Sequence, residues 1–325
     1  MPRGTVFVTR IIHDAGLSIL SKAGLGLRMF RQFRPPSPGE LLGIVATHDA
    51  VLCQLRDRID EPVLSAAAQG GCRIIASAAA GYDNIDIAAA RRHDVIVTHT
   101  PGVLTEAVAD LTWALLLAAA RRVGEAERFI RAEAWRGWSM LEFMGADVHG
   151  KSLGIVGAGR IGAAVARRAT GFSMNVRYFN TRPRPELETA GAKQCSLNEL
   201  LAESDFVSLH VPLTEKTWHM IDERAIGLMK RSAILINTAR GEIIDQPALI
   251  EALRTGRIAA AGLDVFENEP QIDPELYKLE NVVLLPHIGS ATESTRRGMA
   301  EMAARNIVAV LKGERPLNPT PGILK

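Results

Sequence analysis

The chain has 325 residues, a length that predicts two domains rather than one. Hydrophobic residues make up 47% of it and charged residues 23%, which is the balance of a globular protein with a full core and excludes a disordered chain. The formal net charge is +2 and no basic block interrupts the sequence, so we expect no nucleic-acid partner.

The three cysteines, Cys53, Cys72 and Cys195, lie far apart and form no CxxC pair. A sparse, odd set argues against a disulfide framework and against a metal site, and we expect neither. The N-terminus lacks the apolar run of a signal peptide, and the most apolar helical stretch, 108–120, carries Asp110 and is too short to cross a bilayer. We therefore expect a cytoplasmic protein with no membrane partner.

Short apolar runs alternate with helical stretches in the first hundred residues. Strands are expected at 6–9, 50–53, 73–76 and 95–98, and helices at 15–23 and 62–69. Strands separated by helices indicate a parallel sheet of the α/β class. Pro101-Gly102 then breaks the chain, and a long apolar helix follows from Leu104 to about Arg121.

The alternation restarts at Ser152 and is more regular from there on. Strands are expected at 153–156, 176–179, 206–209, 233–236 and 282–285, and helices at 160–170, 197–202 and 246–255. The near-continuous apolar content of these strands is typical of a doubly wound sheet that helices cover on both faces. The last helix, 293–311, is expected to return to the first unit.

A glycine-rich turn stands directly between a predicted strand and a predicted helix. The GxGxxG spacing is present as Gly157-Ala158-Gly159-Arg160-Ile161-Gly162. The first glycine allows the tight turn, the second lets the backbone approach a pyrophosphate, and the third lets helix and strand pack closely. Free N–H groups at the start of the helix then face the phosphate charge. The motif therefore predicts a dinucleotide site at these residues.

The end of the next strand indicates which dinucleotide is preferred. An NAD site needs an acidic residue there for the ribose 2′-OH, but Asn180 holds that place. Arg182 and Arg184 follow, and guanidinium groups suit a 2′-phosphate that a carboxylate would repel. We expect NADP(H) to be preferred and NAD(H) to be the alternative; a solvated arginine-rich loop is the other interpretation of this segment.

Three polar side chains follow strand ends in the second half. They are Arg240 in the segment 235–241, Glu269 in the segment 262–270 and His287 in the segment 285–290. Ligands of open α/β sheets bind at the carboxyl ends of the strands, so the three can meet in one crevice. Reduction of a 2-keto acid needs such a set. Arg anchors the carboxylate and polarises the ketone, His donates a proton, and Glu orients the His and favours its charged form.

These segments, with the glycine-rich turn and Gly81-Tyr82-Asp83-Asn84-Ile85-Asp86, closely resemble the D-isomer-specific 2-hydroxyacid dehydrogenases, and among them glyoxylate/hydroxypyruvate reductases most. The resemblance runs from about Val51 to Pro319. It implies that Arg240, Glu269 and His287 are catalytic, and it favours Glu269 over the competing Glu267 because the family's glutamate directly precedes the proline. Further contacts implied by the resemblance are with the cofactor from Thr105, Thr238, Ala239 and Asp264, and with the substrate from Leu55, Ala80, Gly81, Arg240 and His287.

The strand pattern and the resemblance together predict two doubly wound parallel-sheet α/β domains, with a Rossmann cofactor domain inserted in a flavodoxin-like substrate domain. The substrate-binding domain would comprise residues 1–99 and 291–325, and the NAD(P)-binding domain residues 100–290. A homodimer is also expected. The apolar segment Leu111–Ala120 would need a partner surface, and Trp135 and Trp138 lie in a connection that relatives send across the dimer.

The expected function is NAD(P)H-dependent reduction of a small 2-keto acid, glyoxylate or hydroxypyruvate, to the D-2-hydroxy acid. Other 2-ketoaldonate or phosphoglycerate-type dehydrogenases are alternatives, as is a dinucleotide-sensing binding protein of the corepressor kind. Formate oxidation is disfavoured because formate dehydrogenases carry Gln where Glu269 stands. Two residues depart from the family: His99, where Asn is usual, and Arg56, where relatives often have a small residue.

Overall fold

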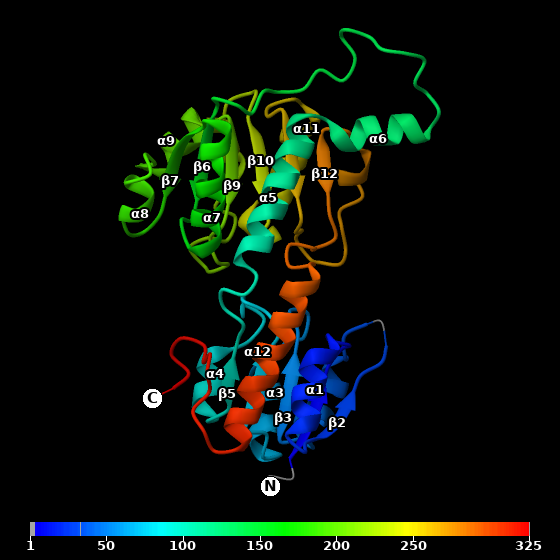
Figure 1. Ribbon diagram of the computed structural model, residues 1–325, viewed down its shortest axis with the longest axis vertical. Coiled ribbons are helices and arrows are strands. Elements are labelled where there is room, and N and C mark those ends of the chain that lie inside the picture. The colour runs from blue at the N-terminus through cyan, green and yellow to red at the C-terminus, as the bar shows by residue number, and fades with distance from the viewer. Residues whose placement is uncertain (1–3, 33, 325) are drawn as a thin grey trace. The chain divides into compact units, whose positions relative to one another are not determined.

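The computed structural model describes residues 4–32 and 34–324, and the chain divides into two compact units (Figure 1). The first unit comprises Met1–Leu104 and Ser290–Lys325, and the second comprises Thr105–Gly289. The expected boundaries after residues 99 and 290 lie within a few residues of these. The first differs because the Pro101-Gly102 break stays with the first unit and helix α5 (Thr105–Ala120) begins the second.

The first unit is built on a parallel sheet whose described strands have the order β2-β1-β3-β4-β5, as in flavodoxin-like folds. The strands are β1 (Thr5–Val8), β2 (Gly26–Met29), β3 (Ala50–Cys53), β4 (Ile74–Ser77) and β5 (Ile96–Thr98). The helices on one face are α1 (Asp14–Lys22) and α12 (Glu293–Leu311), and those on the other are α2 (Pro38–Val45), α3 (Glu61–Gln69) and α4 (Ile87–Arg92).

Strand β3 illustrates why this sheet is buried on both faces. Its side chains alternate, so that Ala50 and Leu52 pack under α1 and α12 while Val51 and Cys53 pack under α2 and α3. Helix α12 confirms the expected return of the chain: it packs against α1 so closely that a Cβ on Gly16 would lie 2.8 Å from the carbonyl oxygen of Ala300. The second unit is therefore an insertion in the first.

The second unit contains a parallel sheet whose described strands have the order β12-β11-β10-β9-β6-β7-β8. The strands are β6 (Ser152–Val156), β7 (Asn175–Phe179), β8 (Lys193–Gln194), β9 (Phe206–Leu209), β10 (Ile234–Asn237), β11 (Ala260–Leu263) and β12 (Val282–Leu284). The chain starts at β6 and builds outward first through β7 and then, in the other direction, from β9. Ligands of open α/β sheets bind at such a reversal of strand order.

Helices cover both faces of this sheet, which confirms the doubly wound class. On one face lie α5 and α7 (Arg160–Ala169), and on the other lie α9 (Leu197–Glu203), α10 (Glu223–Leu228) and α11 (Gln246–Arg254). Shorter elements are α8 (Pro185–Glu188) and the 3₁₀ turns Thr170–Phe172, Gly241–Ile243 and Leu276–Lys278. Strand β10 contributes side chains to the hydrophobic core on each face of the sheet. Ile234 and Ile236 pack under α5, and Leu235 packs under α11.

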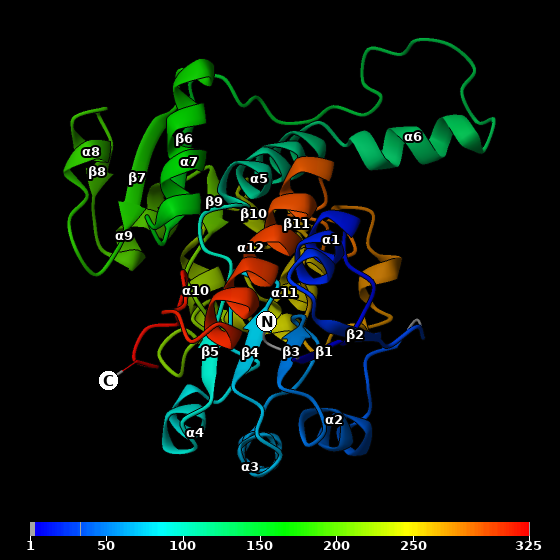
Figure 2. The same cartoon turned by 60° about the horizontal axis from the view of Figure 1, so that its bottom comes forward.

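Helix α5 corrects the expectation that its apolar segment needs a partner chain. Trp113, Leu115 and Leu116 are 6%, 1% and 0% exposed and belong to the core of their own unit. The exposed apolar side chains come later, on helix α6 (Val123–Arg131) and the loop up to residue 145, which we call the arm. They are Val123, Ile130, Trp135, Trp138, Met140, Leu141 and Met144. Figures 1 and 2 both show the arm leaving the body of the second unit.

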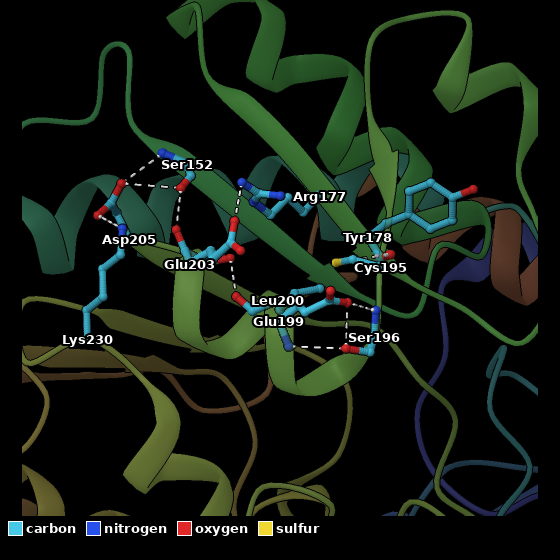
Figure 3. Close-up of polar contacts among 11 residues, drawn as sticks. Ser152, Arg177, Tyr178, Cys195, Ser196, Glu199, Leu200, Glu203, Asp205 and Lys230 are labelled. Atoms are coloured by element: carbon cyan, nitrogen blue, oxygen red, sulfur yellow. Dashed lines mark hydrogen bonds and ion pairs between the residues drawn. The ribbon is translucent and has the colours of Figure 1, made fainter.

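The amino ends of the strands in the second unit are fastened by a polar network around Asp205 (Figure 3). Its carboxylate accepts hydrogen bonds from the backbone N–H of Ser152 at 2.9 Å and from Lys230 Nζ at 2.7 Å. Ser152 Oγ in turn donates to the carbonyl of Glu203 at the end of α9, at 2.8 Å. The network joins β6, β9 and α9 at the edge of the sheet opposite to the glycine-rich turn.

Within residues 4–32 and 34–324, no helix is both long enough and apolar enough for a transmembrane segment. The same residues hold no group of three or more His, Cys, Asp or Glu side chains placed to bind a metal ion. Cys53, Cys72 and Cys195 are free thiols, and burial raises the pKa of the Cys72 thiol to about 12.

Candidate active site

The predicted functional residues of the second unit follow the carboxyl ends of its parallel strands. The glycine-rich turn follows β6, Asn180 follows β7, Arg240 follows β10, Asp264 follows β11 and His287 follows β12. Because all these strands run in the same direction, their carboxyl ends form one edge of the sheet. The site of this unit is therefore assembled along that edge.

The structure brings His287 and Glu269 into direct contact. His287 Nδ1 lies 2.8 Å from Glu269 Oε2 in a hydrogen bond, and the two side chains are 32% and 25% exposed. The other carboxylate oxygen of Glu269 accepts from the backbone N–H of Phe266 at 3.1 Å. Both oxygens of Glu269 are thus engaged, which fixes the direction from which the carboxylate approaches the imidazole ring.

The charge of Arg240 acts on the same carboxylate. Burial by itself would raise the pKa of Glu269, but the hydrogen bond and positive charge of His287, the N–H of Phe266 and the positive charge of Arg240 outweigh it. The pKa of Glu269 therefore lies below its usual value, and the group is a carboxylate at neutral pH. Among the three residues predicted to be catalytic, Glu269 thus interacts with both of the others: with His287 by a hydrogen bond and with Arg240 by charge.

A turn built by Asn237 presents Arg240. Asn237 Nδ2 donates to the carbonyl of Arg240 at 2.7 Å, and Asn237 Oδ1 accepts from the backbone N–H of Ala239 at 3.0 Å. Arg240 Nη1 donates to the carbonyl of Ala239 at 2.7 Å. Beside them, the hydroxyls of Thr238 and Thr112 are hydrogen-bonded at 2.9 Å. Sequence reasoning missed Asn237, although an asparagine at a strand end that bonds the backbone two residues on is a known turn signal.

Asp264 holds the turn that carries His287. Asp264 is 1% exposed, and its carboxylate accepts backbone N–H bonds from Ile288 at 2.7 Å and from Gly289 at 2.8 Å. Burial raises the pKa of Asp264 despite these two bonds. The predicted contact of Asp264 with the cofactor stays a prediction. The structure shows in addition that Asp264 positions the turn of His287.

The three glycines of the turn after β6 meet different surroundings. Gly157 has a φ of +94°, and a Cβ on it would lie 2.7 Å from the backbone nitrogen of Val211. A Cβ on Gly162 would lie 2.2 Å from the carbonyl oxygen of Gly157, whereas one on Gly159 would meet nothing within 4 Å. Gly159 is the N-cap of α7 and has no side chain to cap it. Backbone N–H groups beside open space fit a dinucleotide pyrophosphate.

The remaining predicted cofactor contacts of this edge lie at the start of helices. Arg160 is exposed and Ile161 is partly buried, and they form the first turn of α7. Thr105 is partly buried and begins α5, which packs against α7. Their contact with a cofactor stays a prediction.

The segment after β7 gives its two arginines different surroundings. Arg182 is exposed, and Asn180 Nδ2 donates to its carbonyl at 2.8 Å. Arg184 is partly buried: its backbone N–H donates to Tyr178 at 2.8 Å, and its Nε donates to the carbonyl of Ala158 in the glycine-rich turn at 2.6 Å. Arg184 therefore braces the turn, while Arg182 faces solvent.

The predicted substrate contacts Leu55, Ala80 and Gly81 belong to the first unit and are partly buried. Leu55 follows β3 and the other two follow β4, so all three lie at the carboxyl edge of that unit's sheet. His99, the departure from the family, has a task here. Its Nδ1 is hydrogen-bonded to the carbonyl of Ala80 at 2.8 Å, and its ring packs edge-on against Tyr82. Arg56 is exposed.

Comparison with known proteins decides the family. The sequence model of the D-isomer specific 2-hydroxyacid dehydrogenase, NAD binding domain, matches residues 113–289. The glyoxylate reductase of Thermococcus litoralis is 50% identical over 318 residues, which cover 96% of this chain and 95% of that protein. The chain belongs to the D-isomer-specific 2-hydroxyacid dehydrogenase family. It is an oxidoreductase whose second unit is the NAD-binding domain of that family.

Solved structures share the whole fold of this dehydrogenase. A protein of Thermus thermophilus is 46% identical and has a TM-score of 0.91, with 97% of this chain and 99% of that chain covered. The NADPH-dependent glyoxylate/hydroxypyruvate reductase of Sinorhizobium meliloti, in complex with NADP and malonate, is 30% identical with a TM-score of 0.88. That match covers 99% of this chain and 98% of the other.

Proposed function

We propose that this dehydrogenase reduces glyoxylate to glycolate, or hydroxypyruvate to D-glycerate, with NADPH as the preferred reductant. The observation that carries the proposal is the 2.8 Å hydrogen bond between His287 and Glu269, next to the charge of Arg240 and on the same sheet edge as the glycine-rich turn. The similarity to the glyoxylate reductase of Thermococcus litoralis supports the choice of substrate.

The three side chains have different tasks in the proposed reaction. Arg240 binds the carboxylate of the keto acid and polarises its ketone. His287 donates a proton from Nε2 to the ketone oxygen, which becomes the hydroxyl of the product. Glu269 accepts the Nδ1–H of the ring, holds it in this orientation and stabilises its positive charge. Because Glu269 is ionised at neutral pH, it can do so throughout the physiological range.

The residues of the glycine-rich turn would hold the dinucleotide. Gly159 leaves space for the pyrophosphate, the first N–H groups of α7 would bind it, and Gly157 and Gly162 keep the turn tight. The bound cofactor supplies the hydride. Asp264 would contact the nicotinamide amide, and Thr105, Thr238 and Ala239 would line the cofactor. Arg160 and Ile161 would complete the site.

The preference for NADPH rests on the segment after β7. Asn180 stands where an acid would bind the ribose of NAD, and the exposed guanidinium of Arg182 would pair with the 2′-phosphate. Arg184 would support this contact through its hydrogen bond to the carbonyl of Ala158 in the glycine-rich turn. The NADP complex of the Sinorhizobium meliloti relative supports the preference. NAD(H) is the alternative cofactor.

The two units would divide the work between them. The second, Thr105–Gly289, would bind NADP(H), and the first would bind the substrate carboxylate through Leu55, Ala80 and Gly81. The free thiols of all three cysteines agree with a reducing cytoplasm as the location.

A homodimer is part of the proposal, and the arm is its basis. Trp138, Met140 and Leu141 are 80%, 76% and 71% exposed, which is unusual for such large apolar side chains. Interfaces between permanently paired subunits are rich in aromatic residues and methionine. A second copy of this chain would cover the arm.

Initial rates of reduction test the function directly. Glyoxylate, hydroxypyruvate, pyruvate and 2-ketogluconate are compared with NADPH and with NADH. We expect the largest kcat/KM for glyoxylate or hydroxypyruvate with NADPH. A larger kcat/KM for 2-ketogluconate would instead identify a 2-ketoaldonate reductase. NADPH binding without reduction of any of the four would point to a dinucleotide-sensing protein and would overturn the proposal.

A further inference from the structure

A second histidine–glutamate pair lies beside the candidate active site. His219 Nε2 is hydrogen-bonded to Glu267 Oε1, and Glu267 stands two residues before Glu269 in the same loop. The side chain of Glu267 is only 14% exposed, so its charge is largely removed from water and depends on this partner. The indole ring of Trp218 stacks on the His219 ring, with 4.9 Å between the ring centres.

The backbone of His219 is bonded to the other catalytic loop. Its N–H donates to the carbonyl of Glu242 at 2.9 Å, two residues after Arg240. The next bond in this short parallel bridge runs from the N–H of Ile221 to the carbonyl of Ile243, at 3.0 Å. His219 is thus joined through its backbone to the loop of Arg240 and through its imidazole to the loop of Glu269.

The two loops also touch backbone to backbone. A Cβ on Gly241 would lie 1.9 Å from the carbonyl carbon of Phe266 and 2.3 Å from the nitrogen of Glu267, so only glycine fits there. The N–H of Phe266 holds the carboxylate of Glu269. Any shift of the Phe266–Glu267 backbone away from Gly241 would therefore carry Glu269 away from its place beside His287.

A second hydrogen bond holds the loop of Glu269 near this point in the described part of the chain. The N–H of Glu267 donates to Gln246 Oε1 at 3.2 Å, which is a long hydrogen bond between neutral groups. The bond to His219 has a carboxylate as its acceptor, and charge-assisted bonds are stronger than neutral ones. Among the described residues, the hydrogen bond from His219 therefore holds Glu267 more strongly than the hydrogen bond to Gln246 does.

We propose that His219 is a positioning residue of the reaction, which holds the Glu269 loop against the Arg240 loop through its bond to Glu267. The inference rests on the proposed function, since it concerns the same site. His219 need not touch the substrate: it acts by keeping two catalytic groups at a fixed separation. Loss of the tie would lower kcat and leave the glycine-rich turn, and with it NADPH binding, unchanged.

The test compares H219A, H219Q, E267A and the double variant H219A/E267A. Glutamine can place its amide N–H near the position of His Nε2, so H219Q keeps the bond that H219A removes. Both substitutions keep the backbone N–H and the left-handed φ of +47° at this position, so they carry a similar backbone penalty. The pair His93–Glu61, with 2.6 Å between Nε2 and Oε1, is the matched control because it lies in the first unit.

We expect kcat for glyoxylate to fall by about tenfold or more in H219A, because small misplacements of catalytic groups have effects of this size. H219Q should recover most of this loss, and H93A should leave kcat unchanged. The NADPH dissociation constant should stay within about twofold of the wild type in every variant, because the tie is remote from the pyrophosphate site. The double variant should be no slower than the slower single variant, because the two residues act through one bond.

A kcat for H219A within about twofold of the wild type would overturn the inference, as would H219Q no faster than H219A. If H219A does not fold, E267A decides in the same way: a wild-type kcat overturns the inference and a matching loss supports it. A wild-type chain inactive on all keto acids overturns the proposed function and this inference together. An active wild type with unchanged variants overturns the inference alone.

Discussion

Glu267 and Glu269 stand two residues apart in one loop, yet each carboxylate pairs with a different histidine, Glu267 with His219 and Glu269 with His287. From the sequence both acids were candidates for the partner of the catalytic histidine. The geometry separates them, because the N–H of Phe266 directs Glu269 toward His287 while Glu267 reaches the chain that precedes α10.

The first prediction concerns the pH profile of Glu269→Gln. The pKa of Glu269 lies below its usual value, so the wild-type kcat/KM should hold through the neutral range and fall only at acid pH, where this carboxylate is protonated. Glutamine carries no charge and does not titrate, so the variant should lack this acid fall and be slower by about tenfold or more, because general acid catalysis by His287 loses the carboxylate that orients it. The rate should be measured from acid to neutral pH with saturating NADPH. An unmoved profile in a folded variant would remove Glu269 from this role.

The second prediction concerns the two arginines after β7. Charge-assisted hydrogen bonds contribute about 1.5–3 kcal/mol, so Arg182→Ala should weaken NADPH binding by roughly 10- to 100-fold and leave NADH nearly unchanged. Arg184→Ala should weaken both cofactors, because Arg184 Nε braces the carbonyl of Ala158 in the shared glycine-rich turn. Fluorescence titration with both dinucleotides measures this. Equal losses for NADPH and NADH in Arg182→Ala would contradict the assignment.

The third prediction contrasts two glycines of the same turn. Gly159→Ala should fold normally, because its Cβ would meet nothing within 4 Å, but it should weaken NADPH by about tenfold or more. Gly162→Ala should lower the free energy of unfolding by about 1–3 kcal/mol or more, because its Cβ would lie 2.2 Å from the carbonyl oxygen of Gly157. Thermal unfolding and NADPH titration of both variants separate the two effects. Normal NADPH binding in Gly159→Ala would count against the pyrophosphate assignment.

The fourth prediction concerns the neutral histidine after β9. Burial lowers the pKa of His210 from 6.5 to about 3, so the folded protein resists a proton that the unfolded chain accepts. The contribution of neutral His210 to the free energy of unfolding is fully present above pH 6.5. It is lost as the pH falls toward 3, by at most about 1.4 kcal/mol per pH unit. The stability difference between the wild type and His210→Asn should therefore shrink between about pH 7 and about pH 4.5. Urea titrations at both pH values test it, and a constant difference would contradict it.

The fifth prediction concerns the arm. Light scattering at micromolar concentration should give twice the 35.2 kDa of one chain. Trp138→Ala should change the ranking of keto acids by KM more than it changes NADPH affinity, because the family resemblance implies that this connection crosses the proposed dimer and reaches the partner's substrate pocket. Tyr277, 63% exposed but outside the arm, is the control: Tyr277→Ala should change neither quantity. A stable monomer would contradict the dimer, and an unchanged ranking would contradict the role of Trp138.

The elements that carry the core could be predicted closely from the sequence. The strand at 50–53 and the helix at 293–311 have the predicted bounds, because one is a fully apolar run and the other starts at the N-cap Thr292, whose hydroxyl accepts from the N–H of Thr295. Some of the elements that were missed bury little, although helix α2, which buries Leu41, Ile44 and Val45, was missed as well. Strand β8 has two residues, both exposed, and leaves no hydrophobic pattern. Helix α6 has no buried residue, although its Val123, Ala126 and Ile130 recur with helical spacing.

The candidate site also contains residues that the sequence reveals and contacts that only the structure shows. Arg240, Glu269 and His287 stand in motifs that a local segment of sequence reveals. The tie between His219 and Glu267 joins residues 48 positions apart and has no motif, so only the folded chain shows it. The burial of α5 was also misjudged, since an apolar helix is compatible with a subunit interface and with an internal core, and the packing against the sheet decides between them.

The side chains assigned to the chemistry all lie between residues 240 and 287, within a single unit of the fold. The loops assigned to substrate recognition lie at 54–57 and 78–81, in the other unit. Under the proposed function, proton donation and the first unit's share of substrate recognition are therefore encoded in separate stretches of the gene. Mutations in the two early loops would then change the fit of the keto acid while the proton donor and its partners are inherited unchanged.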